Sequence, residues 1–452
     1  MKKSRFTITT THYILLSFLT AILVGSVLLT LPISSASGQA TPFIDALFTA
    51  TTATCVTGLV VVPTVTAWSL FGHIVILVLI QIGGLGIITI MASITVFLHK
   101  RMGLADRLLL QDAFNLNTLS GLETFVKKVI KGTFIIEGIG ACLYMTVFVP
   151  QFGLKGIWIS VFTSISAFCN AGIDIIAENS LCNYTLNPII NITTCLLIIL
   201  GGLGYIVWWD LMRVSKEKRT KKVKFWRTLT LHSKIAISAT AGLILVGGIL
   251  ILLFEYRNPN TIGQFTFLEK LEVAFFQSVT TRTAGFATIP QENLSNASAI
   301  ICLLLMFIGG SPVGTAGGIK TVTFVVLIAS AFATIRNQKE VNLFGRTLSK
   351  EAVSKAAAVT SMSFAIMFVS TILLSVVTNA DALDIVYETV SATATVGLTR
   401  NLTPILNGYG KLIIIATMYL GRVGPISLAV AFNFKREKKN IIKNPTEEIS
   451  VG

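Results

Sequence analysis

Four short stretches of this sequence each contain a glycine followed by an apolar residue, and they recur at almost equal intervals. TCVTGL at 54–59, FCNAGI at 168–173, TRTAGF at 281–286 and TATVGL at 393–398 place their glycines 114, 113 and 112 residues apart. Self-similarity at a fixed period is the signature of a repeated structural unit. The chain is therefore expected to contain four copies of one unit, each with its glycine in an equivalent place.

Long uncharged runs determine the environment of these copies. Residues 12–31, 60–99, 188–209, 235–254 and 356–380 contain no Asp, Glu, Lys or Arg. Only 13% of all residues are charged, whereas a soluble domain has about a quarter. Because a membrane-spanning helix needs about 20 apolar residues, the sequence predicts a polytopic membrane protein.

The net charge of +15 is distributed in a way that predicts orientation. Of the 36 Lys and Arg residues, 28 lie in five patches, at 2–5, 100–131, 213–234, 336–355 and 435–443. Basic loops stay on the cytoplasmic side of a membrane, so both termini are expected in the cytoplasm. A nucleic-acid surface would need basic and aromatic residues interleaved on one face, and none is evident.

Each copy has the same predicted layout of helix, short re-entrant half-helix, glycine stretch and second helix. The first helices are predicted at 12–31, about 132–149, 235–254 and 356–378, and the second at 70–98, 188–212, 298–335 and 411–434. The half-helices of about ten residues have an aromatic residue ten positions before the glycine: Phe48, Phe162, Phe275 and Tyr387. Three of them have an acidic start, which suits the dipole at a helix N-terminus: Asp45, Glu272 and Asp384.

Two crossings per copy give all four copies one orientation, so they pack around an axis along the membrane normal. The predicted fold class is an all-α polytopic membrane protein with four parallel helix–pore half-helix–filter loop–helix repeats around one pore, which gives pseudo-fourfold symmetry. The predicted boundaries are 1–115, 116–228, 229–345 and 346–434 for the repeats, with a cytoplasmic tail at 435–452.

The glycine stretches are predicted to line a water-filled path, because non-helical backbone at membrane depth needs shielding or water. Glycine permits positive φ, which lets neighbouring carbonyl groups face one axis. Rings of carbonyl oxygens can replace the hydration shell of a monovalent cation. The predicted cation-binding filter residues are Thr54, Cys55, Val56, Thr57, Gly58, Phe168, Cys169, Asn170, Ala171, Gly172, Thr281, Arg282, Thr283, Ala284, Gly285, Thr393, Ala394, Thr395, Val396 and Gly397.

A second glycine-rich stretch, IGGSPVGTAGGIKT at 308–321, interrupts the second helix of the third repeat. Five glycines and a proline in this length disfavour a regular helix, so residues 309–320 are predicted to form an intramembrane gating loop. Arg422 is expected to hold carbonyl groups of this loop, and Arg282 to point away from the axis and pair with an acid behind the filter. The predicted gate residues are Gly309, Gly310, Ser311, Pro312, Gly314, Thr315, Ala316, Gly317, Gly318, Lys320 and Arg422.

With these four stretches and the broken helix, residues 12–434 resemble the Trk, Ktr and plant HKT superfamily of potassium transporters. In that family four fused units each supply one filter strand with a shared glycine, and the third unit carries a gating loop. Only TVGL at 395–398 approaches the TVGYG of potassium channels, which implies looser selectivity over Na⁺. Sodium-preferring HKT members have a serine in place of one glycine, so Gly58, Gly172, Gly285 and Gly397 together favour K⁺.

The resemblance is to the Ktr-type membrane subunit, because the sequence starts with the first repeat and lacks the leading helices of Trk relatives. It implies a homodimer with one pore per chain in a bacterial plasma membrane. A separate cytosolic ring of Rossmann-type (RCK) domains is expected to bind ATP or ADP and to regulate the gate. K⁺ is the expected substrate, no covalent cofactor is expected, and the resemblance allows activation by Na⁺, for which the sequence locates no site.

Two other functional classes were considered. An ion-coupled secondary transporter of another small solute would need several ionisable residues at mid-membrane and inverted repeats. A membrane enzyme would need clustered acid–base or metal-binding groups, but the four histidines, at 12, 73, 99 and 232, are dispersed. The chain is therefore predicted not to be an enzyme, and the transporter of another solute remains the alternative.

Overall fold

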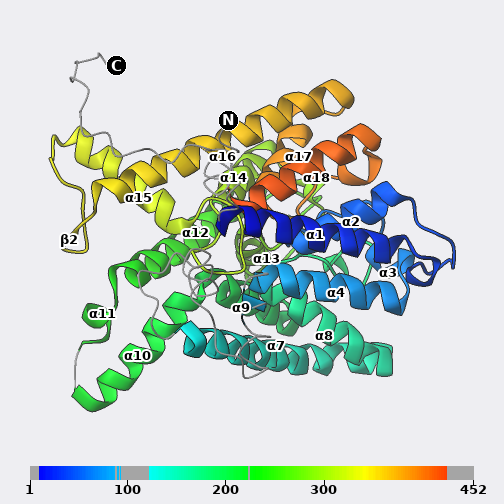
Figure 1. The fold of residues 1–452 in the computed structure, drawn as a ribbon, viewed down its shortest axis with the longest axis horizontal. Coiled ribbons are helices and arrows are strands. Elements are labelled where there is room, and N and C mark those ends of the chain that lie inside the picture. The colour runs from blue at the N-terminus through cyan, green and yellow to red at the C-terminus, as the bar shows by residue number, and fades with distance from the viewer. Residues whose placement is uncertain (1–9, 87–88, 91, 93–121, 222–223, 425–452) are drawn as a thin grey trace, which may run out of the picture.

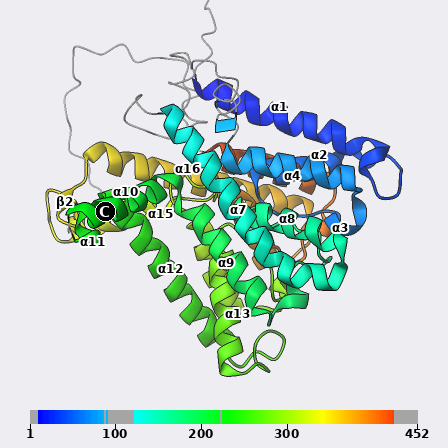
Figure 2. The same cartoon turned by 90° about the horizontal axis from the view of Figure 1, so that it is seen from below.

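The computed structural model describes residues 10–86, 89–90, 92, 122–221 and 224–424. The basic patches at 2–5 and 435–443, most of the patch at 100–131 and the tail at 435–452 lie outside these residues. Almost all regular structure in the described part is helical. Figures 1 and 2 show α10, α11 and the β1–β2 hairpin at one end of the molecule and α3 at the opposite end.

The first helix of each repeat is long and apolar enough to cross a membrane. These helices are α1 (Thr10–Thr30), α7 (Leu122–Phe152), α12 (Leu231–Glu255) and α16 (Lys350–Val377). Each exposes large apolar side chains on its outer face, including Val27, Ile139, Leu253 and Val376. Contiguous exposed apolar surface of this kind suits a lipid environment. All four begin earlier than predicted, most of all α7 by about ten residues and α16 by six.

The predicted half-helices follow, as helices of 13 to 15 residues. They are α2 (Phe43–Cys55), α8 (Leu154–Phe168), α13 (Phe267–Thr280) and α17 (Ala382–Ala394). Asp45 and Asp384 lie in the first turns of α2 and α17, where they pair with Lys411 and Arg400 at 2.5 and 2.6 Å. The prediction for Glu272 was wrong, because α13 begins earlier with a capping box between Thr266 and Glu269.

The predicted aromatic positions are equivalent in three repeats. Phe48, Phe162 and Tyr387 are fully buried. Phe275 is 39% exposed, and its neighbour Phe276 takes the buried place. The fourfold pattern in the sequence therefore fails at Phe275, because α13 presents its next residue to the core.

Each second helix begins at a Ser or Asn whose side chain accepts a backbone N–H of the first turn, the usual N-cap bond. The caps are Ser69, Asn187, Ser295 and Asn407. The helices that follow them are α4 (Leu70–Leu85), α9 (Pro188–Leu203), α14 (Asn296–Phe307) and α18 (Gly408–Val423). All end well before the predicted C-terminus, α4, α9 and α18 near the middle of the predicted span and α14 about a quarter of the way through it.

Glycines with positive φ end three of these helices: Gly86, Gly204 and Gly424, at φ 83°, 86° and 89°. After Gly204 the chain turns by 93° into α10 (Tyr205–Lys221). In the third repeat residues 308–320 separate α14 from α15 (Thr321–Ile335). A break was predicted for the third repeat alone, and this was wrong, because the second repeat is bent as well. In the sequence, the end of the helix in the first, second and fourth repeats is indicated by a glycine two residues after the Gly-Gly or Gly-Arg pair.

Short elements complete the described chain. These are the helices α3 (Thr64–Ala67) and α11 (Phe225–Thr228), the strands β1 (Asn342–Leu343) and β2 (Arg346–Thr347), and the 3₁₀ turns Pro32–Ser34, Cys182–Tyr184, Gln291–Asn293 and Thr403–Ile405. The two strands pair antiparallel, Asn342 with Thr347 and Leu343 with Arg346.

The buried core continues across the boundaries between neighbouring repeats. One cluster joins residues of the first, second and third repeats, a second joins the third and fourth, and a third joins the fourth to the first. Phe286, Tyr387 and Phe48 are fully buried members of these clusters. The contacts therefore close a ring of four repeats, and the predicted fold class is confirmed.

Candidate functional site

The four glycine stretches meet at the centre of this ring. A methyl group added at each glycine would lie 2.3–2.6 Å from the carbonyl oxygen of the residue before the next glycine. In order round the ring the pairs are Gly58 with Ala171, Gly172 with Ala284, Gly285 with Val396, and Gly397 with Thr57. Real Cβ contacts are never this short, so no side chain fits at any of these positions.

Each strand has two left-handed residues, of which the sequence indicated only the glycine. The glycines have φ of 98°, 63°, 83° and 95°, and the residues two positions earlier have φ of 55°, 58°, 63° and 52°. Those earlier residues are Val56, Asn170, Thr283 and Thr395. A β-branched residue at positive φ is a genuine outlier. Alternation between left- and right-handed backbone lets successive carbonyl groups face the same side, as in a carbonyl-lined filter.

The amide groups of the strands are bound to the half-helices behind them. Gly58 N donates to Thr52 Oγ1 at 2.9 Å, and Gly397 N donates to Ser391 Oγ at 3.0 Å. In the second repeat Ile173 N donates to Ser166 Oγ at 3.1 Å. These three N–H groups are therefore satisfied by side chains of the half-helices rather than by neighbouring strand carbonyls.

All of the predicted filter residues are buried. Four hydroxyl groups in the first and fourth strands are buried without a hydrogen-bond partner among the described residues, namely those of Thr54, Thr57, Thr393 and Thr395. Buried polar groups are normally paired with protein or with ordered water. These hydroxyl groups and the strand carbonyls are therefore available to a cation or its water.

On its outer side the ring opens into a cavity of about 340 Å³ that all four glycines line. The carboxyl groups at its wall belong to Asp174, Glu178 and Glu292. Burial raises the pKa of Asp174 to about 6. An acidic cavity with low-dielectric walls concentrates cations at its mouth.

Beneath the ring, residues 308–320 form a closed loop. Its ends are joined by Gly309 N, which donates to Ile319 O at 2.9 Å. Thr315 Oγ1 donates to Phe168 O of the second strand at 3.0 Å, and Gly317 N donates to Thr283 Oγ1 of the third strand at 3.1 Å. The loop is thus bonded directly to two of the four strands.

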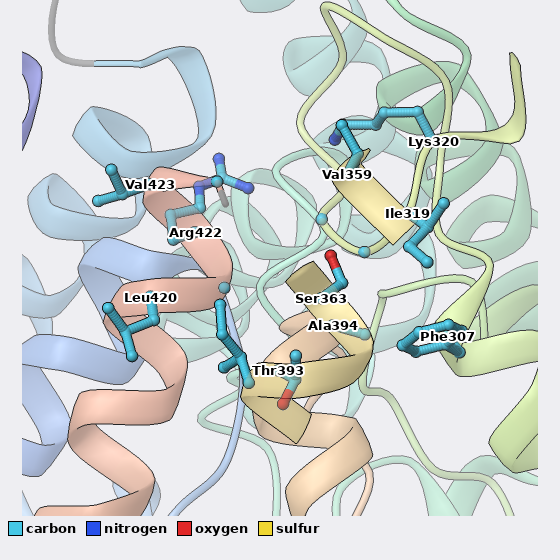
Figure 3. Close-up of a pocket in the computed structure, with 15 residues that line it drawn as sticks. Phe307, Ile319, Lys320, Val359, Ser363, Thr393, Ala394, Leu420, Arg422 and Val423 are labelled. Atoms are coloured by element: carbon cyan, nitrogen blue, oxygen red, sulfur yellow. The ribbon is translucent and has the colours of Figure 1, made fainter. Parts of the chain in front are cut away.

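Arg422 and Lys320 donate hydrogen bonds to carbonyl groups of this loop. Arg422 Nη1 donates to Thr315 O at 2.7 Å, and its Nη2 donates to Gly83 O of α4 at 2.6 Å. Lys320 Nζ donates to Ala316 O at 2.6 Å. Figure 3 shows Lys320 and Arg422 on opposite sides of a cavity of about 250 Å³ that Thr393 also lines.

The remaining predicted gate residues lie in the same loop. Ser311 Oγ shares a hydrogen bond with Thr321 Oγ1 at 2.9 Å, and Ser311 N donates to Gly202 O at 2.8 Å. Gly317 has no room for a side chain, because an added methyl group would lie 1.9 Å from Thr395 Oγ1. The loop therefore also abuts the fourth strand.

Arg282 behaves differently from the prediction. Its side chain is buried and turned from the strand, but it donates to Thr240 O at 3.2 Å and to Gly309 O at 2.9 Å. No acid of the described chain pairs with it. The expected acidic partner was wrong, because backbone carbonyls of α12 and the loop accept the hydrogen bonds of its two terminal nitrogens instead.

The sequence matches the TrkH family, described as cation transport protein, over residues 3–444. Potassium/sodium uptake protein NtpJ of Enterococcus hirae is 39% identical over 100% of this chain and 99% of its own length. Ktr system potassium uptake protein B of Bacillus subtilis is 40% identical over 97% of this chain and 95% of its own. The crystal structure of the potassium transporter TrkH from Vibrio parahaemolyticus superposes with a TM-score of 0.75 and 16% identity, over 95% of this chain and 86% of that one.

Proposed function

The chain belongs to the TrkH family of cation transport proteins, and from that premise we propose that it mediates K⁺ uptake through a carbonyl-lined pore. The observation that carries the proposal is the ring of Gly58, Gly172, Gly285 and Gly397, in which each glycine abuts the carbonyl of the next strand. Four carbonyl-bearing strands around one axis can replace the hydration shell of a monovalent cation.

The proposed gate is the loop at 308–320, held by Arg422. The guanidinium joins Thr315 O to Gly83 O, so it ties the loop to the first repeat. Hydrogen bonds from a charged donor contribute more than neutral ones. A fixed positive charge beside the path also opposes the passage of a cation. Opening then requires that these bonds break and the loop move aside.

Regulation and assembly are proposed from the family resemblance. A cytosolic ring of Rossmann-type domains that binds ATP or ADP is the proposed regulator of the loop, and the membrane subunit is proposed to be a homodimer. We place the protein in a bacterial plasma membrane with both termini in the cytoplasm. The name of the E. hirae relative includes sodium, which supports Na⁺ as a second cation to test.

The proposal is tested by uptake of Rb⁺, a K⁺ congener, into liposomes that contain the purified protein. Arg422→Ala should raise Rb⁺ uptake about tenfold, because losing one to two charge-assisted hydrogen bonds shifts the loop equilibrium by about 1.5–3 kcal/mol. Arg257→Ala, which changes an exposed arginine, is the matched control. Unchanged uptake in Arg422→Ala would count against the gate, and no Rb⁺ uptake by any variant would count against the pore.

A further inference from the structure

One buried acid near the second filter strand has no role in the gate. Glu137 lies at the midpoint of α7 and is only 4% exposed. In the described part of the chain, no Lys, Arg or His forms an ion pair with it. A buried carboxyl group in a membrane helix is costly and is by default a functional candidate.

The internal repeats show what this position otherwise holds. Gly25, Gly140 and Gly247 occupy equivalent places in the first three repeats. A methyl group added at any of them would collide with a leucine, which stands four residues before Gly83, Gly201 or Gly309 in the sequence. Those leucines are Leu79, Leu197 and Leu305. Three residues before the equivalent glycines stand Ile22, Glu137 and Ile244, and all three are buried. The second repeat thus has an acid where the first and third have isoleucine.

The carboxyl group of Glu137 contacts two polar side chains. Gln81 Nε2 of α4 donates to Glu137 Oε1 and Oε2 at 3.2 and 3.4 Å. The thiol of Cys169 lies 3.6 Å from Gln81 Oε1 and 4.0 Å from Glu137 Oε1. Ser164 Oγ of α8 donates to the backbone oxygen of Glu137 at 2.6 Å. The carboxyl group therefore joins α4 to the second filter strand, while the backbone of residue 137 joins α7 to α8.

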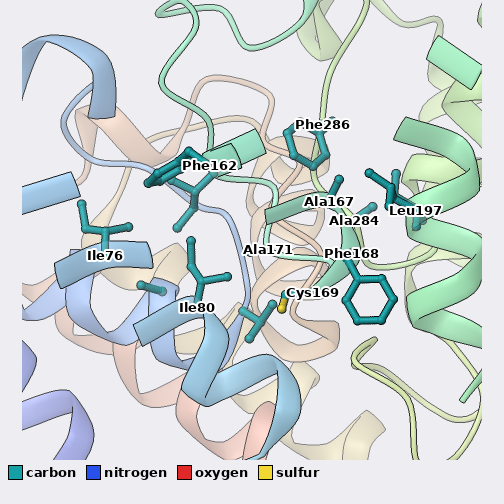
Figure 4. Packing of buried hydrophobic residues seen from close by; sticks show 14 of the residues in the cluster. Ile76, Ile80, Phe162, Ala167, Phe168, Cys169, Ala171, Leu197, Ala284 and Phe286 are labelled. Atoms are coloured by element: carbon teal, nitrogen blue, oxygen red, sulfur yellow. The ribbon is translucent and has the colours of Figure 1, made fainter. Parts of the chain in front are cut away.

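This contact reaches the filter at a sensitive point. Cys169 immediately precedes Asn170, the left-handed residue of the second strand. Gly84 of α4 faces the Cys169 thiol so closely that an added methyl group would lie 2.5 Å from it. Figure 4 shows Cys169 and Phe168 between Ile80 of α4 and Leu197 of α9. The orientation of the Cys169 peptide is thus set by contacts with α4 and with Glu137.

We propose that Glu137 is a positioning residue of the filter, which acts through Gln81 and Cys169 to fix the second strand and so favours K⁺ over Na⁺. The inference rests on the proposed K⁺ pore and adds a determinant of its selectivity. If the strand is held less firmly, its carbonyls can approach a smaller cation, so Na⁺ is rejected less well. Among the three aligned positions only Glu137 is acidic, and the second strand near it also accepts the hydrogen bond of Thr315 Oγ1 at Phe168 O.

The test measures Rb⁺ and Na⁺ uptake and the thermal unfolding midpoint of each variant in liposomes or detergent. Glu137→Ile installs the residue of the first and third repeats. It should lower the Rb⁺/Na⁺ uptake ratio about fivefold, the size expected from losing about one net hydrogen bond. The midpoint should stay equal or rise, because a buried polar group replaced by an apolar one of similar volume is often neutral or stabilising.

Three further variants separate positioning from simple packing. Glu137→Gln keeps an acceptor for Gln81 and should keep the ratio within about twofold of wild type, because that hydrogen bond survives. Gln81→Leu should lower the ratio as Glu137→Ile does, and the double variant should be no worse than either, since both act through one contact. Ile244→Val, at the equivalent position of the third repeat, is the control and should leave the ratio unchanged.

An unchanged ratio in Glu137→Ile would overturn the inference, and if that variant fails to fold, an unchanged ratio in Gln81→Leu would do so instead. A loss in Glu137→Gln as large as in Glu137→Ile would also overturn it, because the charge and not the hydrogen bond would then matter. If wild-type protein takes up no Rb⁺, the proposed pore itself fails, and this inference falls with it.

Discussion

The filter ring of four glycine stretches and the layer beneath it, which contains the glycines at 83, 201, 309 and 421, differ in how residue type determines backbone structure. In the ring, Val, Asn and two Thr occupy the position two residues before the glycine, yet their φ angles all lie between 52° and 63°. In the layer beneath, all four second helices have a glycine at the same place, at positions 83, 201, 309 and 421. In three repeats this glycine abuts the first carbonyl of the repeat's own filter strand, whereas Gly309 abuts Gly317 O of the loop.

The difference separates two sources of backbone conformation. In the ring, packing of four strands imposes one geometry on different side chains, including a valine in a region that suits glycine. In the layer beneath, glycine occupies the equivalent position in all four repeats but makes two different contacts. The contact differs in the third repeat because the 13 residues at 308–320 form a loop there. The same close contact made by glycine is thus directed to the repeat's own filter strand in the first, second and fourth repeats, and to the loop at 308–320 in the third.

The largest expected effect is in the ring, where the four repeats are alike. Gly285→Ala places a side chain at φ 83°, with its methyl group 2.5 Å from Val396 O. A left-handed alanine costs about 1–2 kcal/mol, and relief of the contact moves a filter carbonyl, so Rb⁺ uptake should fall about tenfold or more. Gly38→Ala is the control, because Gly38 has φ 70° and open space around it. Equal loss in both variants would show that backbone strain alone matters.

Smaller effects on Rb⁺ uptake are expected in the layer beneath, with opposite signs for changes at Gly201 and at Gly309. Gly201→Ala would bring its methyl group 2.0 Å from Phe168 O of the filter, and Gly309→Ala would bring it 1.9 Å from Gly317 O of the loop. Overpacking of this kind costs about 1–3 kcal/mol, so Gly201→Ala should lower Rb⁺ uptake about fivefold, whereas Gly309→Ala should displace the loop and raise uptake about threefold. Liposome flux assays read both signs. Uptake that falls in both variants would remove the distinction between the two regions.

The smallest effect is expected at the outer mouth, where only the second repeat has an acid two residues after its glycine, Asp174. Because its pKa is raised to about 6 by burial, Asp174 loses its negative charge as the external pH falls through that value. The K⁺ concentration for half-maximal uptake should then rise about twofold, as the local attraction of cations weakens. Asp174→Asn should show the higher concentration at pH 7.5 and no change between pH 7.5 and 5. A wild-type value constant over that range would contradict the prediction.

Much of this architecture could be predicted from the sequence, because glycine spacing and apolar runs are local signals. They gave the four repeats, the half-helices and the interruption before Lys320. The contact of Arg422 with a loop carbonyl, Thr315 O, could be expected because an arginine inside an apolar segment must satisfy its donors. The part played by each residue in transport remains a proposal.

Other features depend on contacts between distant residues, and no local signal carries them. The left-handed Val56 is imposed by neighbouring strands and contradicts its own propensity. The carbonyl partners of Arg282 come from α12 and the loop, 27 to 42 residues away. Glu137 interrupts an apolar segment in the sequence, but its equivalence to Ile22 and Ile244 follows only from the contacts of Gly25, Gly140 and Gly247.

The bonds of the loop to the filter strands have a thermodynamic consequence. Since Thr315 and Thr283 bond the loop to the second and third strands, displacement of the loop releases groups at the base of the filter. An ion that binds one arrangement of those strands more tightly must then shift the equilibrium between loop positions. By linkage, the loop position changes the binding free energy of the ion by the same amount. In the proposed pore, occupancy and opening are therefore linked variables, and the permeating cation is an effector of its own passage.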